Sequence, residues 1–338
     1  MMTEEKELFV QYTFQVDKKQ SPLRIDKFLV DRIEGISRSR VQTAIADGLV
    51  RVNGVLAKAN YKVRPLDEIE VMTIEEPINH VLEPEELPLN IVYEDDQIVV
   101  INKQSNMVVH PGVGNYTGTL VNGLLHHFRV VQNDEKSRPL LVHRIDKDTT
   151  GLLVVAKNEK ALNFIADQFA KRTTKRRYLA IVWGSFEEKE GTIEGNITRN
   201  PSDRKKFMVT HDPEVGKPAV THYKVLEDYT YVSLVECRLE TGRTHQIRVH
   251  MKYTGHTLFS DHFYGGDRIL KGVVFSKYRQ FIDNCFKILP RQALHAQSLG
   301  FVHPGSGKEM YFETDLPEDF QQVLDKWRRL RDAYDFAD

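Results

Sequence analysis

The chain has 338 residues, 41% of them hydrophobic and 28% charged, and a formal net charge of −1. These values are typical of a globular protein long enough for two domains, and no apolar run approaches the roughly 18 residues that a membrane helix requires. The first residues lack a signal-peptide pattern and the two cysteines form no CxxC pair, which argues against a disulfide framework or a zinc finger and favours a cytoplasmic protein with no membrane partner.

The N-terminal region is predicted to form a strand, followed by two helices and a hairpin. The strand covers residues 8–16. Apolar residues then recur at helical spacing over residues 23–33, and Ser37 is the predicted cap of a second helix that Gly48 ends. The pair Asn53-Gly54, set between alternating apolar residues, predicts a tight hairpin.

Positive charge is concentrated in this region although the whole chain is nearly neutral. Residues 24–64 hold nine lysines and arginines against four carboxylates, whereas residues 67–96 hold acidic residues and no lysine or arginine. Such clustering allows a phosphate-binding surface, for which Arg38, Arg40 and Arg51 are candidates, but a solvated charged face is the alternative interpretation.

An acidic segment with three prolines, residues 75–90, is predicted to be a linker, because proline and like charge disfavour a packed core. Residues 91–338 mix strands and helices, which predicts an α+β domain with a mixed, largely antiparallel sheet and packed helices. We therefore expect an N-terminal extension (1–22), a small basic domain (23–74), the linker and this larger domain. Strands are predicted at 91–93, 98–101, 178–183, 219–225, 231–239 and 245–251, and helices at 117–128, 162–169 and 319–335. The segment 268–289 has no assigned role.

The most informative segment is the charged turn His143-Arg144-Ile145-Asp146, which lies between the apolar runs 140–142 and 151–156. Two buried strands bracketing this turn would hold Asp146 at a strand end, where a carboxylate needs a cationic partner. Asp146 is therefore either half of a structural ion pair or a reactive group. Residues 171–177 follow with five cations in seven positions.

Signatures of cofactor and metal sites are incomplete. Gly112 and Gly114 begin a dinucleotide-binding pattern, but Thr117 stands where its third glycine belongs. Residues 304–308 resemble the end of a phosphate-binding loop, but Glu309 stands where a serine or threonine should bind magnesium. Neither a GxSxG nor an HExxH motif occurs. We expect no cofactor and no metal.

The turn resembles the signature of the RluA-type pseudouridine synthases, and further segments agree with that family in order and spacing. The likeness covers roughly residues 20–320 and is closest to the RluD-like branch, which modifies a hairpin of large-subunit ribosomal RNA. The basic N-terminal domain resembles the small αL-type (S-four-like) RNA-binding domain of many members. Departures are Ile145 for a usual leucine, Gln104 for a common proline and Ser260 for a frequent glycine. The matching segments are 141–153, 175–180, 217–223, 239–251 and 291–296.

The resemblance implies roles for three catalytic residues. Asp146 is the essential carboxylate, either as a nucleophile or in a route through a glycal in which Tyr178 or the carboxylate moves a proton from C2′. Tyr178 is suited to stacking on the uracil. Arg243 is expected to pair with Asp146 and to oppose the rise in its pKa that burial causes.

The remaining candidates are RNA contacts. Arg144 is suited to filling the space left by a flipped-out base. The other expected contacts are His143, Lys147, Arg176, Arg177, Arg38, Arg40 and Arg51. The predicted function is isomerisation of uridine in ribosomal RNA by a monomeric enzyme, and the alternative is a non-catalytic ribosome-assembly factor on the same scaffold. The sequence does not identify the uridine.

Overall fold

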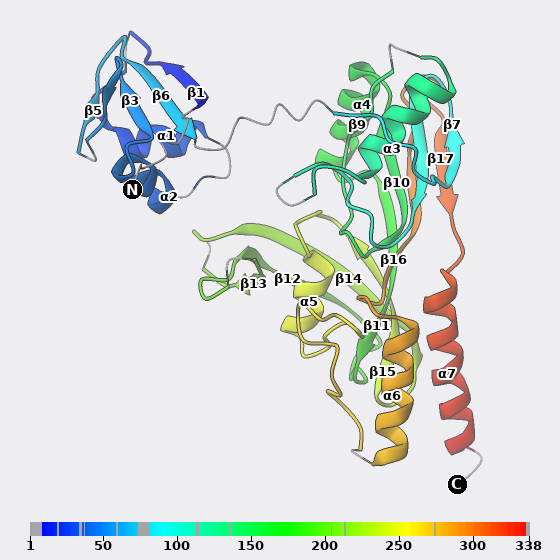
Figure 1. Ribbon diagram of the computed structural model, residues 1–338. Coiled ribbons are helices and arrows are strands. Elements are labelled where there is room, and N and C mark those ends of the chain that lie inside the picture. The colour runs from blue at the N-terminus through cyan, green and yellow to red at the C-terminus, as the bar shows by residue number, and fades with distance from the viewer. Residues whose placement is uncertain are drawn as a thin grey trace, which may run out of the picture. The chain divides into compact units, whose positions relative to one another are not determined.

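The structure is a computed structural model, which describes residues 9–18, 20–33, 36, 38–58, 60–73, 82–112, 115–134, 137–203, 205–212, 214–273 and 275–335. The chain divides into two compact units, residues 1–81 and 82–338, and each is described by itself (Figure 1). The predicted Ser37 cap and residues 75–81 of the predicted linker lie outside the described residues.

The smaller unit packs two helices, α1 (Ile25–Arg32) and α2 (Arg38–Ala46), against a four-stranded sheet in the order β1-β6-β3-β4. The predicted strand, helices and hairpin are confirmed. Asn53 and Gly54 have φ of 49° and 78°, the positive values that a two-residue hairpin turn requires. β1 pairs with β6, so the strand predicted as a separate extension belongs to this sheet. The strands are β1 (Phe9–Gln15), β3 (Val50–Val52), β4 (Val55–Leu56) and β6 (Glu68–Thr73), with β2 (Leu23–Arg24) pairing β5 (Lys62–Val63) apart from them.

The larger unit is built on one sheet of eleven strands, and the predicted mixed, largely antiparallel architecture is confirmed. In the described chain only β10 and β16 pair in parallel. In sheet order the strands are β13 (Phe207–Thr210), β12 (Glu190–Arg199), β14 (Lys217–Asp228), β15 (Val232–Leu239), β11 (Lys175–Trp183), β16 (Leu294–Val302), β10 (Thr150–Ala156), β8 (Ile98–Lys103) and β7 (Ile91–Glu94), with β9 (Leu140–Leu141) beside β10 and β17 (Glu309–Glu313) beside β16.

Helices cover both faces of this sheet. Along β11, Tyr178, Ala180 and Val182 enter one apolar cluster, while Leu179 and Trp183 enter another on the opposite face. The second cluster contains side chains of α6 and α7, which pack side by side (Figure 1). The helices are α3 (Leu120–His126), continued by the π-helical turn His127–Val131, α4 (Glu159–Ala170), α5 (Gln246–Tyr253), α6 (Ser276–Ile288) and α7 (Glu318–Asp335).

The strand predicted at 245–251 is wrong, because these residues form helix α5. His245 precedes the helix with a left-handed φ of 56°, which turns the chain away from an extended path. The alternation of polar and apolar residues had suggested one exposed face, but Gln246, Arg248 and His250 are all buried. Each has a buried hydrogen-bond partner, so the polar residues do not mark solvent.

Residues 82–90, assigned to the linker from sequence, pack against the larger unit. Leu87 and Leu89 contact its main apolar cluster, and the Glu85 amide donates to the carbonyl oxygen of Asn122 at 3.1 Å. The larger unit therefore begins before residue 91.

Candidate active site

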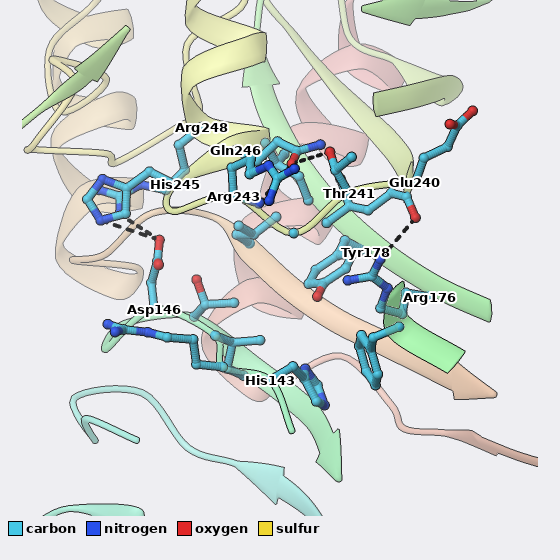
Figure 2. A pocket seen from close by; sticks show the side chains of 18 of the residues that line it. His143, Asp146, Arg176, Tyr178, Glu240, Thr241, Arg243, His245, Gln246 and Arg248 are labelled. Carbon is cyan, nitrogen blue, oxygen red and sulfur yellow. Dashed lines mark hydrogen bonds and ion pairs between the residues drawn. The ribbon is translucent and has the colours of Figure 1, made fainter. Parts of the chain in front are cut away.

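A cavity of about 430 Å³ opens in the larger unit among the turn before β10, the end of α4, the start of β11 and the connection from β15 into α5 (Figure 2). Asp146, Tyr178 and Arg243, the three predicted catalytic residues, all line it. So do the predicted RNA contacts His143, Arg144 and Arg176, although these segments are far apart in the sequence.

A buried lysine, Lys103, binds the backbone of the turn that carries Asp146. The Nζ of Lys103 donates to the carbonyl oxygens of Gln104, Met107 and Lys147 at 2.7 to 2.9 Å. Burial lowers the pKa of Lys103 to about 7, against the charges of Asp148 and Asp146, which raise it. One of the three carbonyl groups belongs to Lys147, the residue directly after Asp146. Lys103 therefore fixes the backbone next to the carboxylate.

Arg248 makes the ion pair with Asp146. Its Nη1 donates to Asp146 Oδ2 at 2.8 Å, while Nε and Nη2 donate to both oxygens of the fully buried Asp261 at 2.7 and 2.9 Å. Burial opposes the charge on Arg248, but the hydrogen bonds and charge of Asp261, together with Asp146, raise its pKa. The guanidinium therefore stays charged and is held by one carboxylate while it faces the other.

The predicted pairing of Arg243 with Asp146 is wrong, since Arg248 takes that position. The Nε of Arg243 donates to the carbonyl oxygen of Pro218 at 3.1 Å, and its amide donates to Gln246. The Arg243 pairing was expected from the resemblance, whereas in the structure helix α5 carries Arg248 to Asp146. Sequence reasoning therefore missed Arg248, although it lies within the motif that was compared.

His245 is a second residue that the sequence analysis did not select. Its Nε2 lies 3.9 Å from Asp146 Oδ2, and its Nδ1 is 2.8 Å from the hydroxyl of Tyr264. The backbone N–H of Phe207 donates to the same hydroxyl at 3.1 Å, which holds Tyr264 in place against the imidazole. Burial lowers the pKa of His245 against the opposing effect of Asp146, so the ring is neutral near pH 7.

Tyr178 lies on the floor of the cavity and is 6% exposed. Burial raises the pKa of Tyr178, Arg176 lowers it and Asp146 raises it further, so the phenol stays protonated at neutral pH. Figure 2 shows it between Asp146 and Arg176. A buried, uncharged ring in this place offers a flat apolar surface beside the Asp146 side chain.

His143 has a structural position. Its Nε2 accepts from the backbone N–H of Val154 at 3.1 Å, and its ring stacks on Phe169 with 4.6 Å between centroids. Burial, helped by Arg176, lowers the pKa of His143 to about 3, so the ring is neutral. His143 therefore supplies no cation for a phosphate, and its predicted contact with RNA stays a prediction.

The other predicted RNA contacts lie outside the cavity. Lys147 is exposed beside it. Arg177 points to the opposite face of the sheet from Tyr178 and pairs with Glu236 and Glu313. Arg38, Arg40 and Arg51 belong to the smaller unit, where Arg38 pairs with Asp26.

Within the described residues, no group of three histidine, cysteine or carboxylate side chains is placed to hold a metal ion. The same residues include no helix long and apolar enough to cross a bilayer.

Comparison with known proteins links this geometry to a family. Residues 97–253 match the family model described as RNA pseudouridylate synthase, and residues 23–69 match the S4 domain. An uncharacterized RNA pseudouridine synthase of Chlorobaculum parvum is 44% identical over 325 residues, covering 95% of this chain and 99% of the relative. Ribosomal large subunit pseudouridine synthase D of Escherichia coli O157:H7 is 41% identical, covering 94% of this chain and 95% of the relative.

A solved structure shares the fold. Human RNA pseudouridylate synthase domain containing 4 superposes with a TM-score of 0.56 at 25% sequence identity, covering 71% of this chain and 93% of the human one.

Proposed function

The chain belongs to the RNA pseudouridylate synthase family and is an isomerase, and from this premise we propose that it converts uridine to pseudouridine in a hairpin of large-subunit ribosomal RNA. The name of the Escherichia coli relative supports this choice of RNA. We further propose that the enzyme acts in the cytoplasm as a monomer. One observation carries the chemistry: Asp146 faces a nucleobase-sized cavity and is bound there by a fixed guanidinium.

The reaction breaks the C1′–N1 and C5–H bonds, turns the uracil, joins C1′ to C5 and leaves a proton on N1, with no net oxidation or reduction. In one route Asp146 attacks C1′ and is later displaced. In the other, uracil departs and Asp146 takes a proton from C2′ to give a glycal, because the phenol of Tyr178 stays protonated and is not the base. Both routes need an ionised carboxylate, so both depend on the same ion pair.

Arg248 supplies the electrostatic condition for this carboxylate. Uracil binding would remove water from Asp146, and loss of water disfavours a charged carboxylate. Arg248 offsets that cost with a charge that Asp261 holds in place, so no reorganisation is needed when the substrate enters. Arg243, which lies at the rim of the cavity, contacts the RNA rather than Asp146 in this proposal.

The target nucleotide must leave its stack to enter the cavity, at a cost of a few kcal/mol. Arg144 is exposed at the mouth and is suited to replacing the lost base. Tyr178 is suited to stacking on the extruded uracil, an interaction worth roughly 1–3 kcal/mol per base. Lys147 and the arginines of the smaller unit, Arg38, Arg40 and Arg51, would contact phosphates outside the cavity. Arg177, on the opposite face of the sheet and paired with Glu236 and Glu313, has no such role in this proposal.

The decisive experiment is to map pseudouridines in the ribosomal RNA of the host with and without this protein. We expect at least one large-subunit pseudouridine to disappear in the deletion strain and to return with the wild-type chain but not with Asp146→Asn. If every pseudouridine remains and ribosome assembly is impaired, the protein is instead a non-catalytic assembly factor.

A further inference from the structure

The cavity contains a second buried arginine that the ion pair of Asp146 does not use. Arg176 is 9% exposed, and its Nη2 donates to the carbonyl oxygen of Leu239 at 3.3 Å. Its Nε has no hydrogen-bond partner, and no carboxylate of the described chain forms an ion pair with it. Its guanidinium carbon lies 5.0 Å from the centre of the Phe169 ring.

This arrangement differs from that of the other buried arginines. Three arginines are buried in the part of the chain that the structure describes, and two of them have a carboxylate bound to both Nε and Nη2: Arg248 with Asp261, and Arg291 with Asp319. Arg176 has none. Burying an uncompensated charge is unfavourable, and burial accordingly lowers the pKa of Arg176. A position that carries this cost without a protein partner is organised for a partner from outside.

The surroundings of Arg176 indicate an anion. Arg172 and Arg243 line the same part of the cavity, and the carboxylate there, Glu240, is already paired with Arg172 at 2.9 Å. Arg172 is 51% exposed, so this end of the cavity is open to solvent. A Cβ on Gly242 would lie only 3.2 Å from Arg176 Nη1, so a glycine at this position lets the backbone pass close to the guanidinium.

We propose that Arg176 binds a phosphodiester oxygen of the RNA, in the backbone beside the target uridine. The proposal rests on the function proposed above and adds a site that binds the substrate backbone from within the cavity. A guanidinium offers donors in a planar fork that matches two phosphate oxygens. A carbonyl oxygen of uracil accepts hydrogen bonds but brings no charge, so it would leave the buried cation uncompensated.

The test measures how the affinity for transcribed large-subunit ribosomal RNA depends on salt, for the wild type, Arg176→Met, Arg176→Lys and a control. Methionine keeps the apolar stem and removes the charge. The control is Arg238→Met, an exposed cation on the opposite face of the sheet that pairs with Glu236. Loss of one phosphate contact reduces the slope of log K against log salt by about 0.7–0.9.

We expect Arg176→Met to bind about 10-fold more weakly and to show this smaller slope, while Arg176→Lys and Arg238→Met keep the wild-type slope. We also expect Arg176→Met to be at least as stable as the wild type in urea, because it removes an uncompensated buried charge. A merely structural arginine would lower stability and leave the slope unchanged.

A wild-type slope in Arg176→Met overturns the proposal. If turnover nevertheless falls, the contact is to the base rather than to a phosphate. This outcome differs from failure of the proposed function, in which the wild type itself forms no pseudouridine in the same RNA.

Discussion

At the scale of single residues, two carboxylates share one arginine. Asp261 is fully buried and accepts hydrogen bonds from both Nε and Nη2 of Arg248, which leaves Nη1 to bind Asp146. The cation is therefore positioned by a group that never meets the substrate. Asp146 is 20% exposed at its side chain and can reach a ligand without losing this partner.

Arg248→Lys tests this arrangement. Lysine keeps the charge but cannot bind both oxygens of Asp261 and reach Asp146 at once, so we expect kcat to fall by about two orders of magnitude. The matched control is Arg243→Lys, which should lose less than about 10-fold because Arg243 does not hold Asp146. Single-turnover pseudouridine formation measures both. A larger loss in Arg243→Lys than in Arg248→Lys would show that Arg243, and not Arg248, supports Asp146.

At the scale of elements, the turn before β10 is fixed by a close approach of two parallel strands. Gly151 has φ of 111°, and a Cβ there would lie 2.2 Å from the carbonyl oxygen of Ala296 in β16. At Gly151, the second residue of β10, the two strands therefore lie too close together for any residue with a side chain. The position of Asp146 depends on this contact, because it lies only five residues before Gly151.

Gly151→Ala is expected to destabilise the protein by at least about 3 kcal/mol, since backbone strain and a clash with backbone add together. Gly307→Ala is the control: its φ of 70° is also unfavourable for alanine, but nothing lies within 4 Å of the added carbon. The control should lose only about 1 kcal/mol, the strain alone. Urea unfolding measures both. Equal losses of stability in the two variants would show that the close approach to β16 adds nothing to the cost of the side chain.

In the smaller unit, helices α1 and α2 are joined through the fully buried Asp26. Burial raises its pKa, but hydrogen bonds from Arg24, Gln42 and Arg38 outweigh that effect and lower it to about 2. A pKa below that of the unfolded chain stabilises the fold above about pH 4, and the contribution is lost as the pH falls toward 2.

We therefore expect Asp26→Asn to cost about 1–2 kcal/mol at pH 7, a value reduced for the partly exposed arginines. The difference from wild type should narrow between pH 4.5 and 2.5, as followed by urea unfolding of the smaller unit. A difference that is constant with pH would mean that the loss comes from packing and not from the charge.

Prediction from sequence succeeded where a local pattern of apolar and turn residues determines the element. All seven residues of β10 are buried, so the apolar run 151–156 was recognisable as a strand, and α7 and the Asn53-Gly54 hairpin were equally clear. It failed at α5, where polar residues are buried with partners supplied by β14 and by Asp261. Since these partners lie in other parts of the chain, no local pattern could identify Arg248 or place His245 beside Asp146.

At the scale of the whole molecule, the two units have separate cores. The apolar cluster of residues 16–71 includes none of the described residues after 82, and the clusters of the larger unit include none before it. The candidate active site accordingly lies in the larger unit and the match to the S4 domain in the smaller one. RNA affinity and isomerisation should therefore be separable.

Deleting residues 1–81 is expected to weaken binding to ribosomal RNA and to flatten its salt dependence, because the basic residues of the smaller unit are lost. Isomerisation at saturating RNA should persist, since the cavity is formed within residues 142–294. Filter binding across a salt series and pseudouridine assays measure the two properties. Complete loss of activity in a folded deletion variant would contradict this separation.

The most direct test is Asp146→Asn in the full chain, a change that removes one negative charge and almost no volume. The account predicts no detectable pseudouridine, RNA affinity within about threefold of the wild type, and unchanged folding. Pseudouridine formation at the wild-type rate in this variant would contradict the claim that an ionised carboxylate at this position performs the reaction.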